Sequence, residues 1–484
     1  MFPIFASIAS VALVLWSDRH SLRLRTLPLG TTVVLVYSLT YGLGLSLWMS
    51  DPSSLFGYGT QSTLGALYNL SLAYSLFISI SAATYCALTL VVCNPRPSSS
   101  LIIFKNHSKA LSRLSLLVLA CSSLALLLML LLGLFSRDPQ FQSSALQSSV
   151  LAKALVGTSL VSRLAPVALI LIVPSWKNWT PLSRNISVLL MSLWLMVSMA
   201  SSSRGLLISL PLYLFLGLLI FRRVPVKIFI LGALVSGLIF VPVAETIRVS
   251  REGDNSNSEL TRKYELFQIG KQLMGTTHEF YLFLQPPDCQ SDLARKLSND
   301  PSLSRLLGIP SEDLPPLSNQ RWNVVRLYEA CANRSLGLRQ LQGFERLPLG
   351  FIPNSLVPSA PSLFDGQSQV ESLSDQLGLR PGEISQGTLS LFADAWWRYR
   401  WLGVALSGFI LGLLLFSFQR LFYFLMLKMP QFGLLAQLLG LSLIGTWINN
   451  TALTMLWFLF WDLPKSWVEL LLILLLSRSK SKER

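Results

Sequence analysis

The stretch LSLLVLACSSLALLLMLLLGLF, residues 114–135, holds no Asp, Glu, Lys or Arg. As a helix it would extend about 33 Å, enough to cross the hydrocarbon core of a bilayer. Ten further apolar runs have spanning or near-spanning length: residues 2–16, 27–48, 64–92, 146–173, 186–200, 205–221, 228–244, 401–418, 432–460 and 467–476. With 52% hydrophobic and 13% charged residues, the chain is predicted to be an all-α polytopic membrane protein of about eleven transmembrane helices.

A polar insert interrupts these runs between Ile247 and Thr388. It divides the chain into an N-terminal membrane block of about eight helices (1–246), a large loop (247–400) and a C-terminal block of about three helices (401–484). Residues 259–275 and 321–341 have helical apolar spacing, whereas the prolines between and after them favour loops. We therefore expect a mostly helical loop. No internal repeat is visible, which weighs against a secondary transporter.

The net charge of +15 is unevenly distributed between the connections. One set of alternate connections, together with the C-terminal tail, holds eighteen Lys and Arg residues, and the other short connections hold three. This bias predicts an N-terminus outside, a C-terminus in the cytoplasm and an external insert. It also explains most of the positive charge without nucleic acid. The first apolar run has basic residues after it rather than before it, so we interpret it as a retained helix.

The cysteines of the insert are Cys289 and Cys331. In an oxidising compartment they are candidates for a disulfide, and the alternative is two separately buried thiols. Three scattered histidines and no clustered Cys or Asp ligands argue against a metal site, and no Gly-rich nucleotide loop is present. We therefore expect neither a metal nor a cofactor.

Arg204 lies in the turn MASSSRG, residues 199–205, between two short apolar segments. Charged groups at such depth are costly and usually functional or paired. A helix that restarts at Gly205 would direct free N–H groups towards an anion. We interpret Arg204 as a phosphate or diphosphate ligand; the alternative is an arginine at an ordinary external turn.

Two further arginines, Arg248 and Arg251, open the insert. Their spacing places both guanidinium groups on one face if the preceding helix continues, and a guanidinium fork suits diphosphate oxygens. The alternative is interfacial snorkelling or pairing with Glu245 and Glu252. Within the membrane, Arg163 lies near mid-depth beside Pro166 and should face protein, water or an anionic head group.

Acid–base and sugar-binding candidates are fewer. His278 and Glu279 form the histidine–carboxylate pair of the insert and could take a proton from a sugar hydroxyl, although a solvated pair is the simpler interpretation. Asp394 and Arg398 lie in or beside the aromatic run 396–401, which would suit either a sugar ring or the membrane interface.

These features together resemble the bacterial O-antigen and exopolysaccharide repeat-unit polymerases (Wzy-like), which are related to the O-antigen ligases. The resemblance is carried by the SSSRG turn at 201–205, the Arg248 and Arg251 pair, and the return segments GTLSLFAD (387–394), LGV (402–404) and LGL (411–413). It implies a metal-independent glycosyltransferase with a helical membrane fold of the C type. In such a protein, arginines would stabilise the diphosphate leaving group of an undecaprenyl-diphosphate-linked oligosaccharide.

The return segment departs from the related ligases, which carry a histidine late in the loop where this chain has Asp394 to Arg398. This favours a polymerase and leaves the general base unassigned. The expected location is the bacterial inner membrane with a periplasmic loop, and the expected partners are the bilayer, a chain-length regulator and a flippase. The alternatives are an O-antigen ligase, a glycolipid flippase or anion transporter, and a structural scaffold.

Overall fold

The computed structural model describes residues 2–19, 27–50, 61–92, 100–134, 149–157, 160–200, 204–221, 390–443, 447, 455–456 and 458–479. Every regular element within these ranges is a helix. The N-terminal block holds α1 (Phe2–Ser17), α3 (Leu29–Tyr37), η1 (Ser38–Gly42), α4 (Leu43–Ser50), α6 (Gln61–Val91), α7 (Ser100–Asn106), α8 (Ser108–Leu131), α10 (Val150–Gly157), η2 (Leu160–Leu164), α11 (Ala165–Ser175), α12 (Pro181–Ala200) and α13 (Arg204–Phe221). The C-terminal block holds α23 (Leu391–Lys428), α24 (Pro430–Ser442), η5 (Phe458–Asp462) and α27 (Leu463–Ser479). The elements labelled η are π-helical turns.

Five helical stretches of the described part are long and apolar enough to cross a membrane: 29–46, 67–91, 108–131, 181–198 and 399–428. Three shorter apolar helices, 2–17, 160–175 and 209–221, accompany them. The chain is thus a helical membrane protein, as predicted. The expected count of about eleven spans is not confirmed: the described residues show these five stretches and three shorter helices, and the run 228–244 lies outside them.

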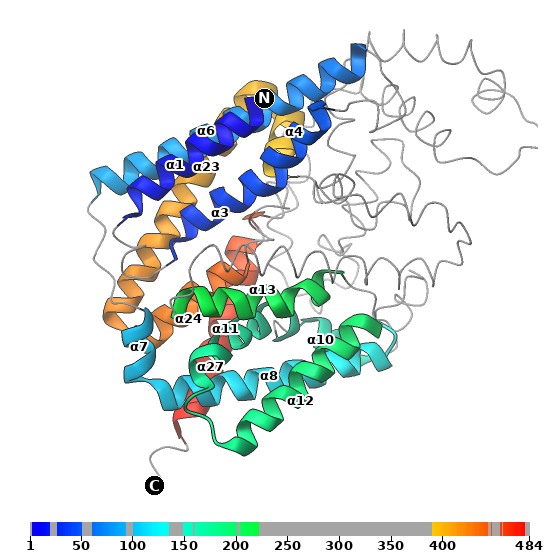
Figure 1. Ribbon diagram of the computed structural model, residues 1–484, viewed down its shortest axis with the longest axis vertical. Coiled ribbons are helices and arrows are strands. Elements are labelled where there is room, and N and C mark those ends of the chain that lie inside the picture. The colour runs from blue at the N-terminus through cyan, green and yellow to red at the C-terminus, as the bar shows by residue number, and fades with distance from the viewer. Residues whose placement is uncertain are drawn as a thin grey trace, which may run out of the picture.

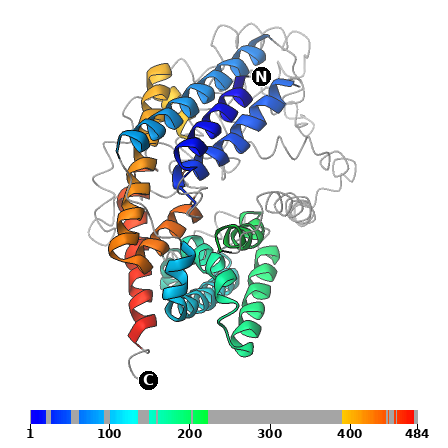
Figure 2. The ribbon, with the colours of Figure 1, turned by 60° about the vertical axis from the view of Figure 1, so that its left-hand side comes forward.

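The helices form two groups (Figure 1). In one group α6 packs along α23 and α1, with α3 beside them; in the other, α8, α11, α12 and α13 pack together. Helix α24 contacts members of both groups, α23 and α3 on one side and α11 on the other. Figure 2 shows the same separation from a second direction, with α27 running towards the C-terminus. One hydrophobic core nevertheless extends through both groups.

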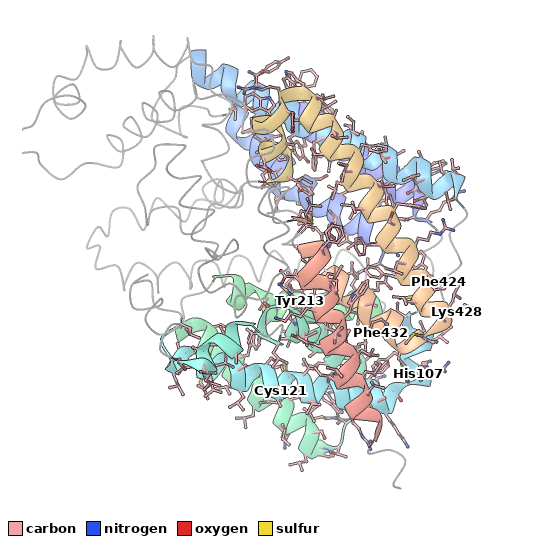
Figure 3. All side chains as sticks on the ribbon, turned by 180° about the vertical axis from the view of Figure 1, so that it is seen from behind. His107, Cys121, Tyr213, Phe424, Lys428 and Phe432 are labelled. Carbon is pink, nitrogen blue, oxygen red and sulfur yellow. The ribbon has the colours of Figure 1, made fainter. Side chains whose placement is uncertain are left out.

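Several contacts hold α3, α7, α23 and α24 together at one end of the bundle. The Gln419 side chain accepts a hydrogen bond from the Leu29 amide, and the Gln437 amide donates to the Leu27 carbonyl at 2.8 Å. Helix α7 contacts α24, and Figure 3 shows His107 and Lys428 at the same edge of the molecule. The start of α3, helix α7 and the junction of α23 with α24 therefore lie together at one end of the helices.

Candidate functional site

Arg163 lies midway between Val150, where α10 begins, and Ser175, where α11 ends. It belongs to the π-helical turn η2, directly before the first turn of α11, which contains Pro166. Proline has no N–H to donate to the carbonyl four residues earlier, so a regular α-helical pattern cannot continue through this point. The local sequence thus favours a break in the helix where the arginine is placed.

The Arg163 guanidinium is held by one short stretch of the C-terminal block. Its Nη2 lies 2.6 Å from Oδ2 of Asp462, and its Nη1 donates to the Asp462 carbonyl oxygen at 3.1 Å and to Ser466 Oγ at 3.3 Å. Ser466 Oγ in turn donates to the Asp462 carbonyl at 2.7 Å. Because Asp462 ends η5, each partner of this ion pair lies in a π-helical turn.

This ion pair is partly buried, with side chains 19% (Arg163) and 24% (Asp462) exposed. Removing one partner of a buried pair typically costs about 3–5 kcal/mol, whereas an apolar replacement of both is often neutral. Stability alone therefore gives little reason to keep two charges at membrane depth. Intramembrane ionisable groups more often mark a functional site.

Helix α13 begins close to this site. Its Leu210 packs against a cluster that includes Ala165 of α11, with Val161 of η2 beside it. Two turns further, Gly217 lies so close to α11 that an added Cβ would be 2.5 Å from the Ile170 carbonyl oxygen. These two contacts place α11 and α13 parallel. Arg204 precedes Leu210 by six residues, so its backbone lies about 9 Å beyond the level of Arg163, towards the α10 end.

A third helix ends near this level. Tyr213 OH donates to the carbonyl oxygen of Ser442, the last residue of α24, at 2.9 Å. The thirteen residues of α24 extend only about 20 Å, less than the thickness of a hydrocarbon core. Both α24 and α27 contact η2. Interrupted helices from both blocks thus meet around Arg163.

The remaining predicted residues are placed as follows. Helix α13 begins at Arg204, as the restart of a helix in this turn predicted, but the description stops at its backbone. Asp394 is fully buried in the first turn of α23, within the group of helices that holds α6; its predicted sugar contact is untested. Six other predicted residues and the side chain of Arg398 lie outside the described part: Arg248, Arg251, His278, Glu279, Cys289 and Cys331.

Sequence reasoning missed Asp462 and Ser466. Asp462 lies in the short connection between the apolar runs 432–460 and 467–476. A carboxylate flanked closely by apolar runs on both sides is the signal that could have identified it. Among the described residues, no group of three His, Cys, Asp or Glu side chains could hold a metal ion. The site therefore offers a cation, a carboxylate and a hydroxyl.

Another buried carboxylate, Asp18, lies near the start of α3. Asp18 follows α1 and accepts hydrogen bonds from Thr31 Oγ1 at 2.6 Å and from Tyr85 OH at 2.9 Å. Burial raises the pKa of Asp18 to about 6, although the hydrogen bonds from Thr31 and Tyr85 act to lower it. Each hydroxyl can donate a hydrogen bond to an ionised carboxylate or accept one from a protonated carboxyl group, so the cluster is compatible with either charge state of Asp18.

The fold and the site define a helical membrane protein with an ion pair between its N-terminal and C-terminal blocks. No protein-family description, curated protein or solved structure matches this chain.

Proposed function

We propose that this chain is a polymerase that joins lipid-linked oligosaccharide repeats at the external face of a bacterial inner membrane. The observation that carries the proposal furthest is the arginine held at membrane depth, Arg163, with the start of α13 at Arg204 about 9 Å further along. A permanent cation at that depth and the N-terminus of a helix both favour binding of an anion. Together they suit a phosphate group that is attached to a lipid.

In the proposed reaction, a hydroxyl of one repeat attacks the anomeric carbon of another repeat. The new C–O bond forms as the bond to the diphosphate breaks, and the departing polyprenyl diphosphate takes the electron pair. Arg204, with Arg248 and Arg251, neutralises this developing charge, and each well-placed contact is worth a few kcal/mol. The hydroxyl proton passes to a base that remains unassigned, for which His278 and Glu279 are candidates.

Arginine replacement in cells tests this proposal. Arg204→Ala, at unchanged protein level, should abolish long polymer and leave single repeats, because the leaving group loses its counter-charge. Arg113→Ala is the matched control, since Arg113 is an exposed arginine of α8 in a connection that the charge count places in the cytoplasm. Normal glycan lengths on gels of the Arg204→Ala strain would refute the proposal.

A second candidate function is a glycolipid flippase or anion transporter. It is favoured by the interrupted helices around Arg163, because transporters commonly bind substrates at such breaks near the bilayer midplane. Glycan gels separate the functions: a lost polymerase leaves single-repeat caps, a lost ligase leaves polymer on its carrier lipid, and a lost flippase leaves repeats inside the cell.

A further inference from the structure

Three oxygen atoms surround the end of the Arg163 side chain. They are Oδ2 and the carbonyl oxygen of Asp462 and Oγ of Ser466, at 2.6, 3.1 and 3.3 Å from Nη2 or Nη1. Two of them come from one residue and engage both terminal nitrogens of the guanidinium. One is a carboxylate oxygen and the other a backbone carbonyl oxygen; a phosphate group can offer two oxygens of its own to the same two nitrogens.

Both partners belong to backbone that can rearrange locally. Asp462 is the last residue of η5, and Arg163 lies in η2; π-helical turns are rare and are frequently found at functional sites. The pair is also open on one side, since about a fifth of each side chain is exposed. An anion can therefore approach Arg163 without separation of α27 from its neighbours.

From these observations we propose that Asp462 is a resident counter-ion, which a phosphate-class oxyanion replaces on Arg163. In the resting protein the carboxylate neutralises the buried cation; in the loaded protein the anion takes over that role and Ser466 continues to hold the guanidinium. The identification of the anion as the diphosphate of a lipid-linked substrate rests on the proposed function.

Thermal unfolding of the full chain in nonionic detergent, titrated with inorganic diphosphate, tests the exchange. Asp462→Asn removes the competing charge while keeping the side chain's size, so its affinity for diphosphate should rise on the order of tenfold or more. Arg163→Gln should lose the response. Glu469→Gln, which removes a carboxylate of α27 instead of the one at the end of η5, should respond like wild type. An affinity in Asp462→Asn that is equal to or weaker than wild type overturns the proposal.

A second variant, Asp462→Ala purified with diphosphate present throughout, tests the proposal if Asp462→Asn does not fold without diphosphate. We expect it to stay folded with diphosphate and to unfold when diphosphate is removed. Failure to accumulate in both conditions also overturns the proposal, because an anion able to replace the carboxylate must restore the charge balance.

Nanodiscs distinguish the source of the anion. If polyprenyl diphosphate stabilises Asp462→Asn and phosphatidylglycerol does not, the site takes the lipid-linked diphosphate. If phosphatidylglycerol stabilises it equally, exchange at Asp462 stands and the substrate assignment of the proposed function fails. Loss of polymer in Arg204→Ala cells, without any gain of diphosphate affinity in Asp462→Asn, would support the proposed function and overturn the exchange at Asp462.

Discussion

At Arg400 the backbone adopts a φ of 53° and a ψ of −139°, a combination that side chains other than glycine rarely accept. The residue divides α23 into a short buried segment and a long membrane helix, and its guanidinium lies 4.2 Å from the centre of the Trp396 ring. Gly403 is pressed against the Ala395 carbonyl in the same bend. The apolar stretch 399–428, which is long enough to cross a membrane, thus begins at a strained turn.

We expect Arg400→Gly to be more stable than Arg400→Ala by about 1 kcal/mol, because only glycine relieves the positive φ. Both variants lose the stacking on Trp396, so their difference reports the backbone strain that glycine relieves, less the larger unfolded-state entropy of glycine. Chemical unfolding of the two purified proteins in the same detergent measures it. Equal stability would show that the turn carries no strain at this residue.

Asp18 predicts how stability depends on pH. Its pKa is about 6 in the folded protein against an ordinary value of 3.8, so the folded state binds the proton more tightly. This contribution is fully present below pH 3.8 and is lost as the pH rises through 6, by about 3 kcal/mol at most. Asp18→Asn cannot ionise and should therefore lower the dependence of the melting temperature on pH between these values. A variant with the wild-type pH profile would contradict this account.

At the scale of elements, the sequence predicted helices better than it predicted their breaks. The run 114–135 became α8, and 205–221 became α13, because length and hydropathy determine whether a segment spans a bilayer. The runs 146–173 and 432–460, each expected as one helix, contain breaks: the π-helical turn η2 in the first and the end of α24 at Ser442 in the second. Both runs remain apolar across these breaks, so hydropathy does not reveal where the backbone hydrogen-bonding pattern changes.

The packing of α6 against α23 depends on two glycines one turn apart. An added Cβ at Gly408 would lie 2.8 Å from the Phe77 carbonyl oxygen, and one at Gly412 would lie 2.5 Å from that of Ser81. Small residues four apart allow membrane helices to approach this closely.

Gly412→Leu should therefore lower the melting temperature, since its side chain would have to separate the two helices, at about 1–3 kcal/mol or more. Leu413→Phe is the matched control: it enlarges the neighbouring side chain, which is 39% exposed, and should leave stability nearly unchanged. If the two variants melt alike, the close contact is not essential to the fold.

At the scale of the whole molecule, the charge pattern predicts which connections share one side of the membrane. That assignment stays a prediction, since several of those connections lie outside the described residues. The Arg163–Asp462 pair could not be predicted in this way. The sequence places Arg163 near mid-depth and predicts that it faces protein, water or an anionic head group. In the structure its guanidinium contacts Asp462 and Ser466. Asp462 lies 299 residues away along the chain, and the packing of α27 against η2 brings the two together.

The N-terminal and C-terminal blocks therefore both contribute to one polar centre, formed by Arg163, Asp462 and Ser466. In our account this centre and the predicted arginines Arg204, Arg248 and Arg251 hold the diphosphate of a lipid-linked oligosaccharide while its sugar is transferred. Since the sequence carries no metal or nucleotide signature, the account requires only lipid-linked substrate.

The most direct measurement is lengthening of a polyprenyl-diphosphate-linked oligosaccharide by the purified chain in proteoliposomes containing a metal chelator and no nucleotide. The account predicts glycans of several repeats together with released polyprenyl diphosphate for wild type and for Arg113→Ala, and neither product for Arg204→Ala. Unchanged single repeats with the wild-type protein, or equal lengthening by Arg204→Ala, would contradict it.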